Sequence, residues 1–121
     1  MAEIHKIYTL STCDTSRRIL KPIKTEEFKV KDIKKEAITP SEIEELKKYA
    51  GSYEALFSRR SRSYIALGLK NQKLSEDDYK KLILSDYTFL KRPVVLIGDE
   101  IFIGNQKKNI ESLYSKLAID G

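Results

Sequence analysis

The chain has 121 residues, of which 40% are hydrophobic and 34% are charged, and its 23 basic and 18 acidic side chains give a net charge of +5. This length favours one domain with a real hydrophobic core, and the composition is that of an ordinary globular protein. The single cysteine excludes an internal disulfide and a cysteine-rich zinc site, and one histidine argues against other metal chemistry. The positive charge suits an anionic ligand, an acidic partner or simply a lysine-rich solvated surface.

The N-terminal residues 1–6 lack the apolar segment of a secretory signal. No apolar run is long enough to cross a bilayer as a helix. We therefore expect a cytoplasmic monomer that does not contact membranes, in a compartment where a free thiol stays reduced.

The first third of the chain predicts a strand, a helix and a second strand. Residues 4–10 are rich in isoleucine, tyrosine and leucine, as strands are. We expect a helix over residues 15–21, with Asp14 or Thr15 as its cap. Residues 27–33 alternate between apolar and polar side chains, which favours a second strand.

The middle of the chain, roughly residues 38–88, predicts several helices. One begins at a Thr-Pro-Ser-Glu sequence at residues 39–42 and ends at Gly51. One or two short helices are expected over residues 53–65, and Ser75 caps another helix that has acidic residues in its first turn.

The last third of the chain predicts a hairpin and a helix. Residues 94–97 form a continuous apolar run, as in a fully buried strand. A turn at residues 98–99 joins this strand to another at residues 100–104. Residues 105–117 then carry apolar side chains at helical spacing.

This order of elements predicts an α/β fold, a thioredoxin-like mixed sheet in a single domain over residues 1–121. The first two strands would be parallel, joined by a right-handed crossover, and the last two antiparallel. The helical stretch at about residues 38–88 is too long for a loop, so we expect it to be an insertion.

The lone cysteine, Cys13, lies where the first predicted strand meets the first predicted helix. A thiol at that junction feels the positive end of the helix dipole and the free N–H groups of the first turn. Both favour the thiolate, which is the nucleophilic form, whereas Asp14 opposes it by like-charge repulsion. A buried structural cysteine is the alternative, but the polar loop and the arginines that follow favour a reactive thiol.

Four segments in this order and spacing together resemble the arsenate reductase family. They are Ser-Thr-Cys-Asp-Thr-Ser-Arg at 11–17, Leu-Phe-Ser-Arg-Arg-Ser at 56–61, Leu-Lys-Arg-Pro-Val-Val at 90–95 and Ile-Gly-Asn at 103–105. The family includes glutathione-dependent arsenate reductases and the RNA polymerase regulator Spx. The resemblance spans nearly the whole chain and implies the thioredoxin-like fold that the element order predicts.

The resemblance implies catalytic roles for Cys13, Arg60 and Arg92. Cys13 would be the nucleophile, and the two arginines would hold an oxyanion and lower the pKa of the thiol. Arginine suits this task because its planar guanidinium donates paired hydrogen bonds and stays charged. A solvated basic face is the interpretation we keep for Arg59 and Arg62.

The resemblance also implies that Pro93 is cis and lies across from the cysteine, and we place Thr15, Ser16 and Pro93 in the anion site. Ser16 stands where several relatives carry the second cysteine of a Cys-x-x-Cys motif. Oxidised Cys13 must therefore be resolved by an external thiol such as glutathione, or by a partner protein. Alternatively, Ser16 could donate a hydrogen bond to the thiolate.

The chain departs from the enteric-type arsenate reductases at two positions. Gly104 aligns with their third arginine, and Thr9 aligns with a histidine upstream of the cysteine. These departures weaken the prediction that arsenate itself is the substrate.

Two functions follow from the resemblance. The first is a glutathione-linked thiol reductase that acts on an oxyanion or a mixed disulfide, with no bound cofactor and with glutaredoxin as a further partner. The second is an Spx-like adaptor on RNA polymerase, because residues 51–54 align with a glycine at the polymerase contact. A helix C-cap is the alternative account of Gly51. Direct nucleic-acid binding is disfavoured, since the basic residues form no long stripe with interleaved aromatics.

Overall fold

A computed structural model describes residues 5–119, and the chain divides into two compact units. The sheet unit contains the residues up to Glu36 and those from Arg92 onward, and the helical unit contains Ala37–Lys91. The helical unit thus corresponds to the insertion that the sequence predicts at about residues 38–88. Each unit is described by itself below.

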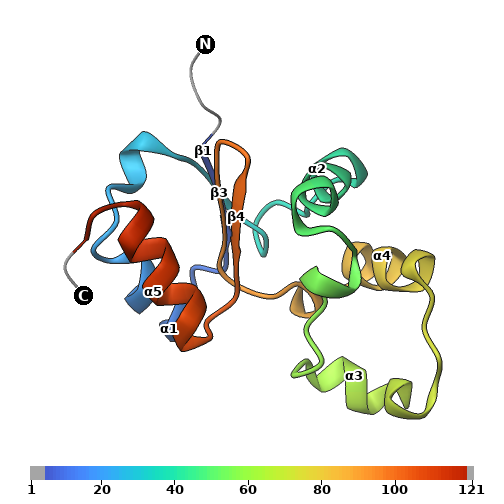
Figure 1. Ribbon diagram of the computed structural model, residues 1–121. Helices are drawn as coiled ribbons and strands as arrows, with labels where there is room; N and C mark the ends of the chain where they lie inside the picture. Colours follow the sequence, from blue (N-terminus) through green and yellow to red (C-terminus); the bar gives the residue numbers. More distant parts are fainter. Residues whose placement is uncertain (1–4, 120–121) are drawn as a thin grey trace. The chain divides into compact units, whose positions relative to one another are not determined.

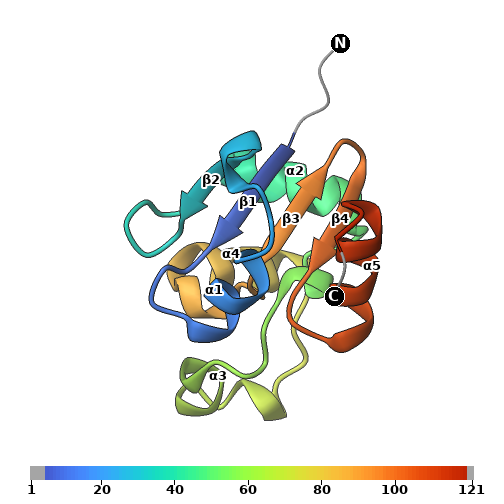
Figure 2. The ribbon, with the colours of Figure 1, turned by 90° about the vertical axis from the view of Figure 1, so that its left-hand side faces the viewer.

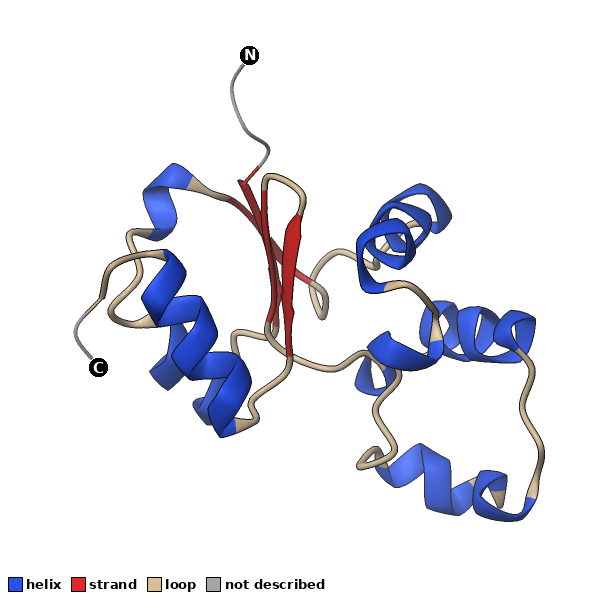
Figure 3. Ribbon diagram, in the orientation of Figure 1, coloured by secondary structure: helices blue, strands red, loops and turns tan. Residues whose placement is uncertain are grey.

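The sheet unit is built on a four-stranded mixed sheet, drawn in red in Figure 3. Its strand order is β2-β1-β3-β4, with β1 and β2 parallel and both β1–β3 and β3–β4 antiparallel. The parallel first pair and the antiparallel hairpin confirm the sequence prediction. The strands are β1 (His5–Thr9), β2 (Lys29–Asp32), β3 (Val94–Ile97) and β4 (Glu100–Ile103).

Three of the predicted strands are longer than the observed ones, and the last of them, predicted to end at Gly104, ends at Ile103 as β4. The predicted first strand begins at residue 4, which lies outside the described residues, and β1 ends at Thr9. The predicted second strand includes Glu27, which instead belongs to a 3-10 turn over Thr25–Glu27. The turn closes when the Phe28 N–H donates to the Thr25 carbonyl at 2.9 Å, so sheet pairing starts only at Lys29.

Helices α1 (Asp14–Leu20) and α5 (Lys107–Lys116) cover one face of the sheet (Figures 1 and 2). The Tyr114 hydroxyl of α5 donates to the Ile19 carbonyl of α1 at 2.7 Å. Burying each large aliphatic side chain of this core stabilises the fold by about 1.5–3 kcal/mol. The core residues are Ile7, Ile19, Leu20, Ile23, Val95, Ile97, Phe102 and Leu113.

The helical unit contains α2 (Pro40–Ala50), α3 (Arg62–Ala66) and α4 (Glu76–Ser85). Both longer helices begin with the capping box that the sequence indicates, Thr39 with Glu42 and Ser75 with Asp78. In the interior, the Phe57 ring stacks on Phe89 with centroids 5.1 Å apart. Further 3-10 turns lie at Glu54–Leu56, Leu69–Asn71 and Tyr87–Phe89.

Among residues 5–119, no helix has both the length and the apolar character needed to cross a membrane.

Candidate functional site

Cys13 lies in the sheet unit, at the end of the turn that connects β1 to α1. Its N–H donates to the Leu10 carbonyl at 2.9 Å, and its carbonyl accepts from the Arg17 N–H at 3.0 Å. The thiol is free and half-buried, and the residue has extended backbone angles of φ −93° and ψ 111°. Cys13 is therefore the N-cap residue of α1.

The predicted cap residues, Asp14 and Thr15, were wrong by one or two positions. The tight turn that ends at Cys13 gives that residue the extended backbone of a cap, so Asp14 already lies in the first helical turn. There the Asp14 carboxylate pairs with the Arg17 guanidinium, one turn further along the helix. Thr15 is half-buried in the same turn, and its predicted role in anion binding stays a prediction.

A carboxylate at the end of β2 holds the loop that leads to Cys13. The Ser11 hydroxyl donates to one oxygen of Asp32, and the Lys34 N–H donates to the other at 3.1 Å. The hydrogen bond from Ser11 is the largest influence that holds the pKa of Asp32 below its usual value. Sequence reasoning missed this pair, because nothing in the local sequence links two residues on different elements.

The pKa of the Cys13 thiol is lowered by its neighbours in the sheet unit. Burial raises this pKa, but hydrogen bonds from the Ser16 hydroxyl and the Ser16 backbone N–H lower it, and so do the charge and a hydrogen bond of Arg92. The lowering influences outweigh the effect of burial. This part of the site agrees with the prediction of a reactive thiolate.

Ser16 is fully buried in the third position of α1. Among the described residues, no nitrogen or oxygen atom forms a hydrogen bond with the Ser16 hydroxyl. The hydroxyl is nevertheless close enough to the Cys13 sulfur to lower the pKa of that thiol. A buried hydroxyl that lacks an acceptor is unfavourable, and the Cys13 thiolate would supply that acceptor. The geometry therefore agrees with the predicted role of Ser16 as a donor to the thiolate.

Arg92 and Pro93 come directly before β3, and the peptide bond between them is cis, as the resemblance implies. Arg92 is half-buried, whereas Pro93 is buried. The Pro93 carbonyl accepts from the Gly104 N–H at 2.9 Å, which ties the end of β4 to the start of β3. Ser16 and Arg92 therefore both lie close enough to Cys13 to donate hydrogen bonds to its sulfur.

Gly104 occupies the position that aligns with the third arginine of enteric-type arsenate reductases. Its φ of +84° lies in the left-handed region, which glycine adopts at little cost. The Asn109 side chain accepts from the Ile103 N–H at 3.1 Å and donates to the Gly104 carbonyl at 2.8 Å. The tight connection from β4 to α5 therefore explains a glycine at this position.

Arg60 belongs to the helical unit, so its predicted place beside Cys13 stays a prediction. It lies on a turn between the Glu54–Leu56 turn and α3, and its side chain is exposed. Its backbone N–H donates to the Ser58 hydroxyl at 3.3 Å.

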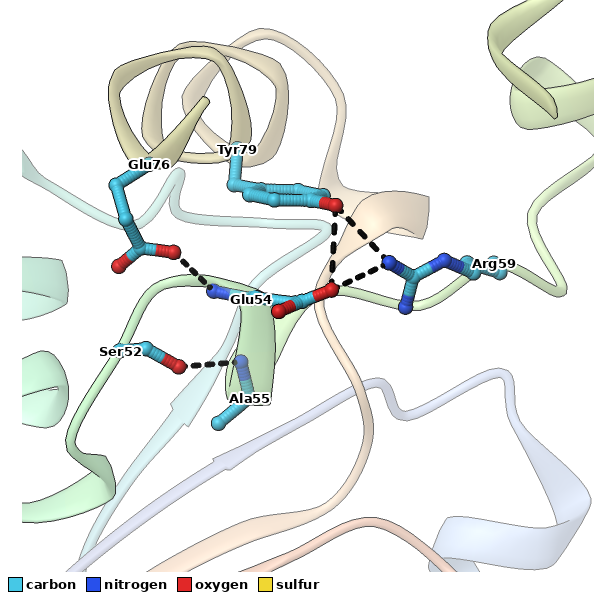
Figure 4. A network of polar contacts seen from close by, with 6 residues as sticks. All are labelled: Ser52, Glu54, Ala55, Arg59, Glu76 and Tyr79. Atoms are coloured by element: carbon cyan, nitrogen blue, oxygen red, sulfur yellow. Dashed lines mark hydrogen bonds and ion pairs between the residues drawn. The ribbon is translucent and has the colours of Figure 1, made fainter. Parts of the chain in front are cut away.

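Arg59, interpreted from the sequence as part of a solvated basic face, is exposed, but it also has partners in the helical unit (Figure 4). Its guanidinium donates to the Glu54 carboxylate at 2.7 Å and to the Tyr79 hydroxyl at 2.9 Å. It also lies over the rings of Phe57 and Tyr79, at 5.9 and 5.7 Å from their centroids. The hydrogen bond to Glu54 is the main cause that raises the pKa of Arg59. Arg59 thus anchors the turn that carries its neighbour Arg60.

Gly51 ends α2 with a left-handed φ of +94°, and its N–H donates to the Lys47 carbonyl at 2.8 Å. The next segment is capped by the Glu76 carboxylate, which accepts from the N–H groups of Tyr53 and Glu54 at 2.7 and 3.1 Å; Figure 4 shows the Glu76–Glu54 contact. The helix C-cap thus accounts for Gly51 without a partner protein.

Comparisons with known proteins agree with this arrangement. Residues 8–113 match the ArsC family, although no curated protein matches the chain. A structure described as a possible arsenate reductase from Streptococcus mutans UA159 is 28% identical, covers 92% of this chain and 98% of that one, and gives a TM-score of 0.70. A protein from Staphylococcus aureus COL, solved by NMR, is 27% identical, covers 90% and 97%, and gives 0.69.

An arsenate reductase from Vibrio cholerae, 18% identical, covers 95% of this chain and 98% of that one, with a TM-score of 0.74 that supports the fold alone. The family match spans most of the sequence, including Cys13, Arg60, Arg92 and Gly104. The mixed four-stranded sheet, with its helices in the order described, is the thioredoxin-like α/β fold that the sequence predicts. The chain therefore belongs to the ArsC family.

Proposed function

We propose that this protein is a one-cysteine thiol oxidoreductase of its family, with Cys13 as the nucleophile and glutathione as the thiol co-substrate. The observation that carries the proposal is the position of Cys13 at the N-cap of α1, beside the buried Ser16 hydroxyl and Arg92, which lower the pKa of its thiol. A thiolate at neutral pH is the reactive form of cysteine, and it needs a reducing compartment such as the cytoplasm. Glutathione is proposed because the chain has no second cysteine to resolve an intermediate.

On a mixed disulfide, the reaction is thiol–disulfide exchange. The Cys13 thiolate attacks one sulfur, a Cys13–sulfur bond forms, the substrate's sulfur–sulfur bond breaks, and the second sulfur leaves as a thiolate. A glutathione thiolate then attacks the sulfur bound to Cys13. This attack releases the Cys13 thiolate and a disulfide that contains glutathione, so each disulfide bond broken is replaced by one formed.

On an oxyanion, Arg92 and Ser16 supply charge and hydrogen bonds beside the sulfur, and we expect Arg60 to add a second guanidinium. Transition-state stabilisation depends on donors already in place where charge develops. This chain has Gly104 and Thr9 where enteric-type relatives carry an arginine and a histidine. We therefore propose that the site binds oxyanions but reduces arsenate weakly.

Mild peroxide followed by glutathione tests the proposal by intact-protein mass spectrometry. Peroxide converts the Cys13 thiolate to a sulfenic acid, and glutathione condenses with it to form a mixed disulfide and water. We expect one glutathione per chain, removed again by glutaredoxin and excess glutathione, and none on Cys13→Ser. Absence of the adduct, or formation of protein dimers alone, would contradict the proposal.

The polymerase-adaptor function is not proposed as a second candidate. The sequence feature that favoured it was Gly51, and the left-handed C-cap of α2 accounts for that glycine.

A further inference from the structure

Two of the three large hydrophobic side chains that are exposed among residues 5–119 are close in sequence, Ile65 in α3 and Leu67 at its C-cap. Ile65 is 78% exposed and Leu67 is 57% exposed. The third, Val30, is 47% exposed on β2 in the sheet unit. Figures 1 and 2 show α3 at the end of the helical unit away from α2.

Helix α3 contacts the rest of the helical unit through hydroxyl groups as well as through the ring of Tyr64. Its N-cap residue Ser61 is buried, and the hydroxyl groups of Ser61 and Thr88 form a hydrogen bond at 2.7 Å. The Ser63 hydroxyl donates to the Asp86 carboxylate at 2.7 Å. Surface helices usually turn apolar side chains inward and polar ones outward. Here serines attach α3 to the unit, and its isoleucine and the adjoining leucine remain outside.

The segment over residues 55–75 is also basic, while acidic residues flank it at Glu54 and at residues 76–78, and Glu54 pairs with Arg59. Residues 55–75 contain five basic and no acidic side chains. The remaining residues contain 18 basic and 18 acidic side chains, so the net charge of +5 comes entirely from this segment. Arg62, Lys70 and Lys73 are all exposed. We call Arg62, Ile65, Leu67, Lys70 and Lys73 the α3 patch.

We propose that the α3 patch binds an acidic protein, whose apolar side chains cover Ile65 and Leu67 while its carboxylates pair with the surrounding basic residues. Apolar anchors within a charged rim are the usual composition of a specific protein interface. The complementary charge would guide the encounter, and the apolar contact would hold the complex. The interaction is independent of the thiol chemistry proposed for Cys13.

The same observations disfavour other occupants. A second copy of the chain would place two positively charged segments against each other. Single-stranded nucleic acid would need exposed aromatic rings for stacking, whereas Tyr64, the aromatic residue of α3, is half-buried with its ring centroid 6.1 Å from that of Phe57. A membrane surface would require a longer amphipathic helix than the five residues of α3.

The test uses the full chain and a labelled amphipathic peptide with leucines on one face and glutamates on the other. Binding is followed by fluorescence anisotropy and located by amide chemical-shift changes. We expect the affinity to fall about tenfold for the double variant Ile65→Ser and Leu67→Ser. We also expect it to fall for Arg62→Glu, at high salt, and when the peptide's glutamates are replaced by glutamines. Val30→Ser and Lys24→Glu, which alter exposed residues of the sheet unit, are the matched controls and should bind as the unaltered chain does.

Thermal unfolding shows whether the double variant retains its fold, and Leu67→Ser alone is the milder substitute if it does not. Equal loss of binding in Val30→Ser, or shifts outside residues 61–73, would overturn the proposal. So would a patch-dependent interaction with anionic vesicles, with single-stranded RNA or between copies of the chain when the acidic peptide does not bind. Because Cys13 is not involved, failure of the glutathione reaction leaves this result unaffected.

Discussion

Replacing Ser16 with alanine removes one donor to the Cys13 thiolate and little else. The Ser16 side chain is fully buried, and its hydroxyl has no other partner among the described residues. The Ser16 backbone N–H and Arg92 still favour the thiolate, so the pKa of Cys13 should rise only by the part that the Ser16 hydroxyl contributed. While the thiol is protonated, the lost hydroxyl should cost almost no folding stability, because no acceptor is left unpaired.

The expected magnitude follows from the strength of that hydrogen bond. A hydrogen bond to a charged group contributes about 1.5–3 kcal/mol, and because Cys13 is only half-buried, water would offset part of the loss. The lower limit corresponds to about a tenfold smaller thiolate fraction at a pH below the pKa. A more basic thiolate is also more nucleophilic, with a Brønsted coefficient of about 0.4–0.5, so the exchange rate at that pH should fall only about threefold.

The assay is the rate of reaction of Cys13 with a chromogenic aromatic disulfide, measured across pH. For Ser16→Ala, we expect the midpoint of the profile to move to higher pH and the plateau rate at alkaline pH to rise. Thr12→Ala is the matched control, because it removes an exposed hydroxyl from the residue next to Cys13. A profile for Ser16→Ala that superimposes on that of the unaltered chain would refute the assignment of Ser16 as the donor.

Three further predictions concern the same unit. Arg92→Ala should raise the pKa of Cys13 and weaken sulfate binding in calorimetry. Arg92→Lys should restore the charge but not the paired hydrogen bonds of the guanidinium. Equal behaviour of the two variants would contradict a role for the guanidinium geometry. The folded state lowers the pKa of Cys13, so folding favours the thiolate. In urea unfolding, the free energy of unfolding of the unaltered chain should therefore increase relative to that of Cys13→Ser as the pH rises through the folded pKa to about 8.5. The pKa of Asp32 is also lowered, so its contribution to stability is lost as pH falls below about 4, and Asp32→Asn should flatten that acid-side loss. An unchanged acid limb in Asp32→Asn would show that the Ser11–Asp32 contact does not form in solution.

Local interactions made much of the fold predictable from the sequence. The capping boxes that begin α2 and α4, and the left-handed glycine that ends α2, depend on residues within one helical turn of each other. The apolar run of β3 indicates a strand buried on both faces, and all four of its residues are buried. The order of these elements then leaves few topologies, and the parallel β1–β2 pair and the antiparallel β3–β4 pair agree with the predicted pairings.

The contacts within the candidate site depend on residues that are far apart in the sequence. The turn ending at Cys13 makes the cysteine itself the cap of α1, one residue before the nearer of the two predicted caps. Ser11 meets Asp32, and Arg92 influences Cys13, only because the sheet brings separate strand ends together. Arg59 was predicted to lie on a solvated face and is exposed, but its contact with the ring and hydroxyl of Tyr79 on α4 follows only from the tertiary structure. Element type follows from contacts within a few residues, whereas partners of charged side chains and the ionisation of the thiol follow from residues that tertiary folding brings into contact.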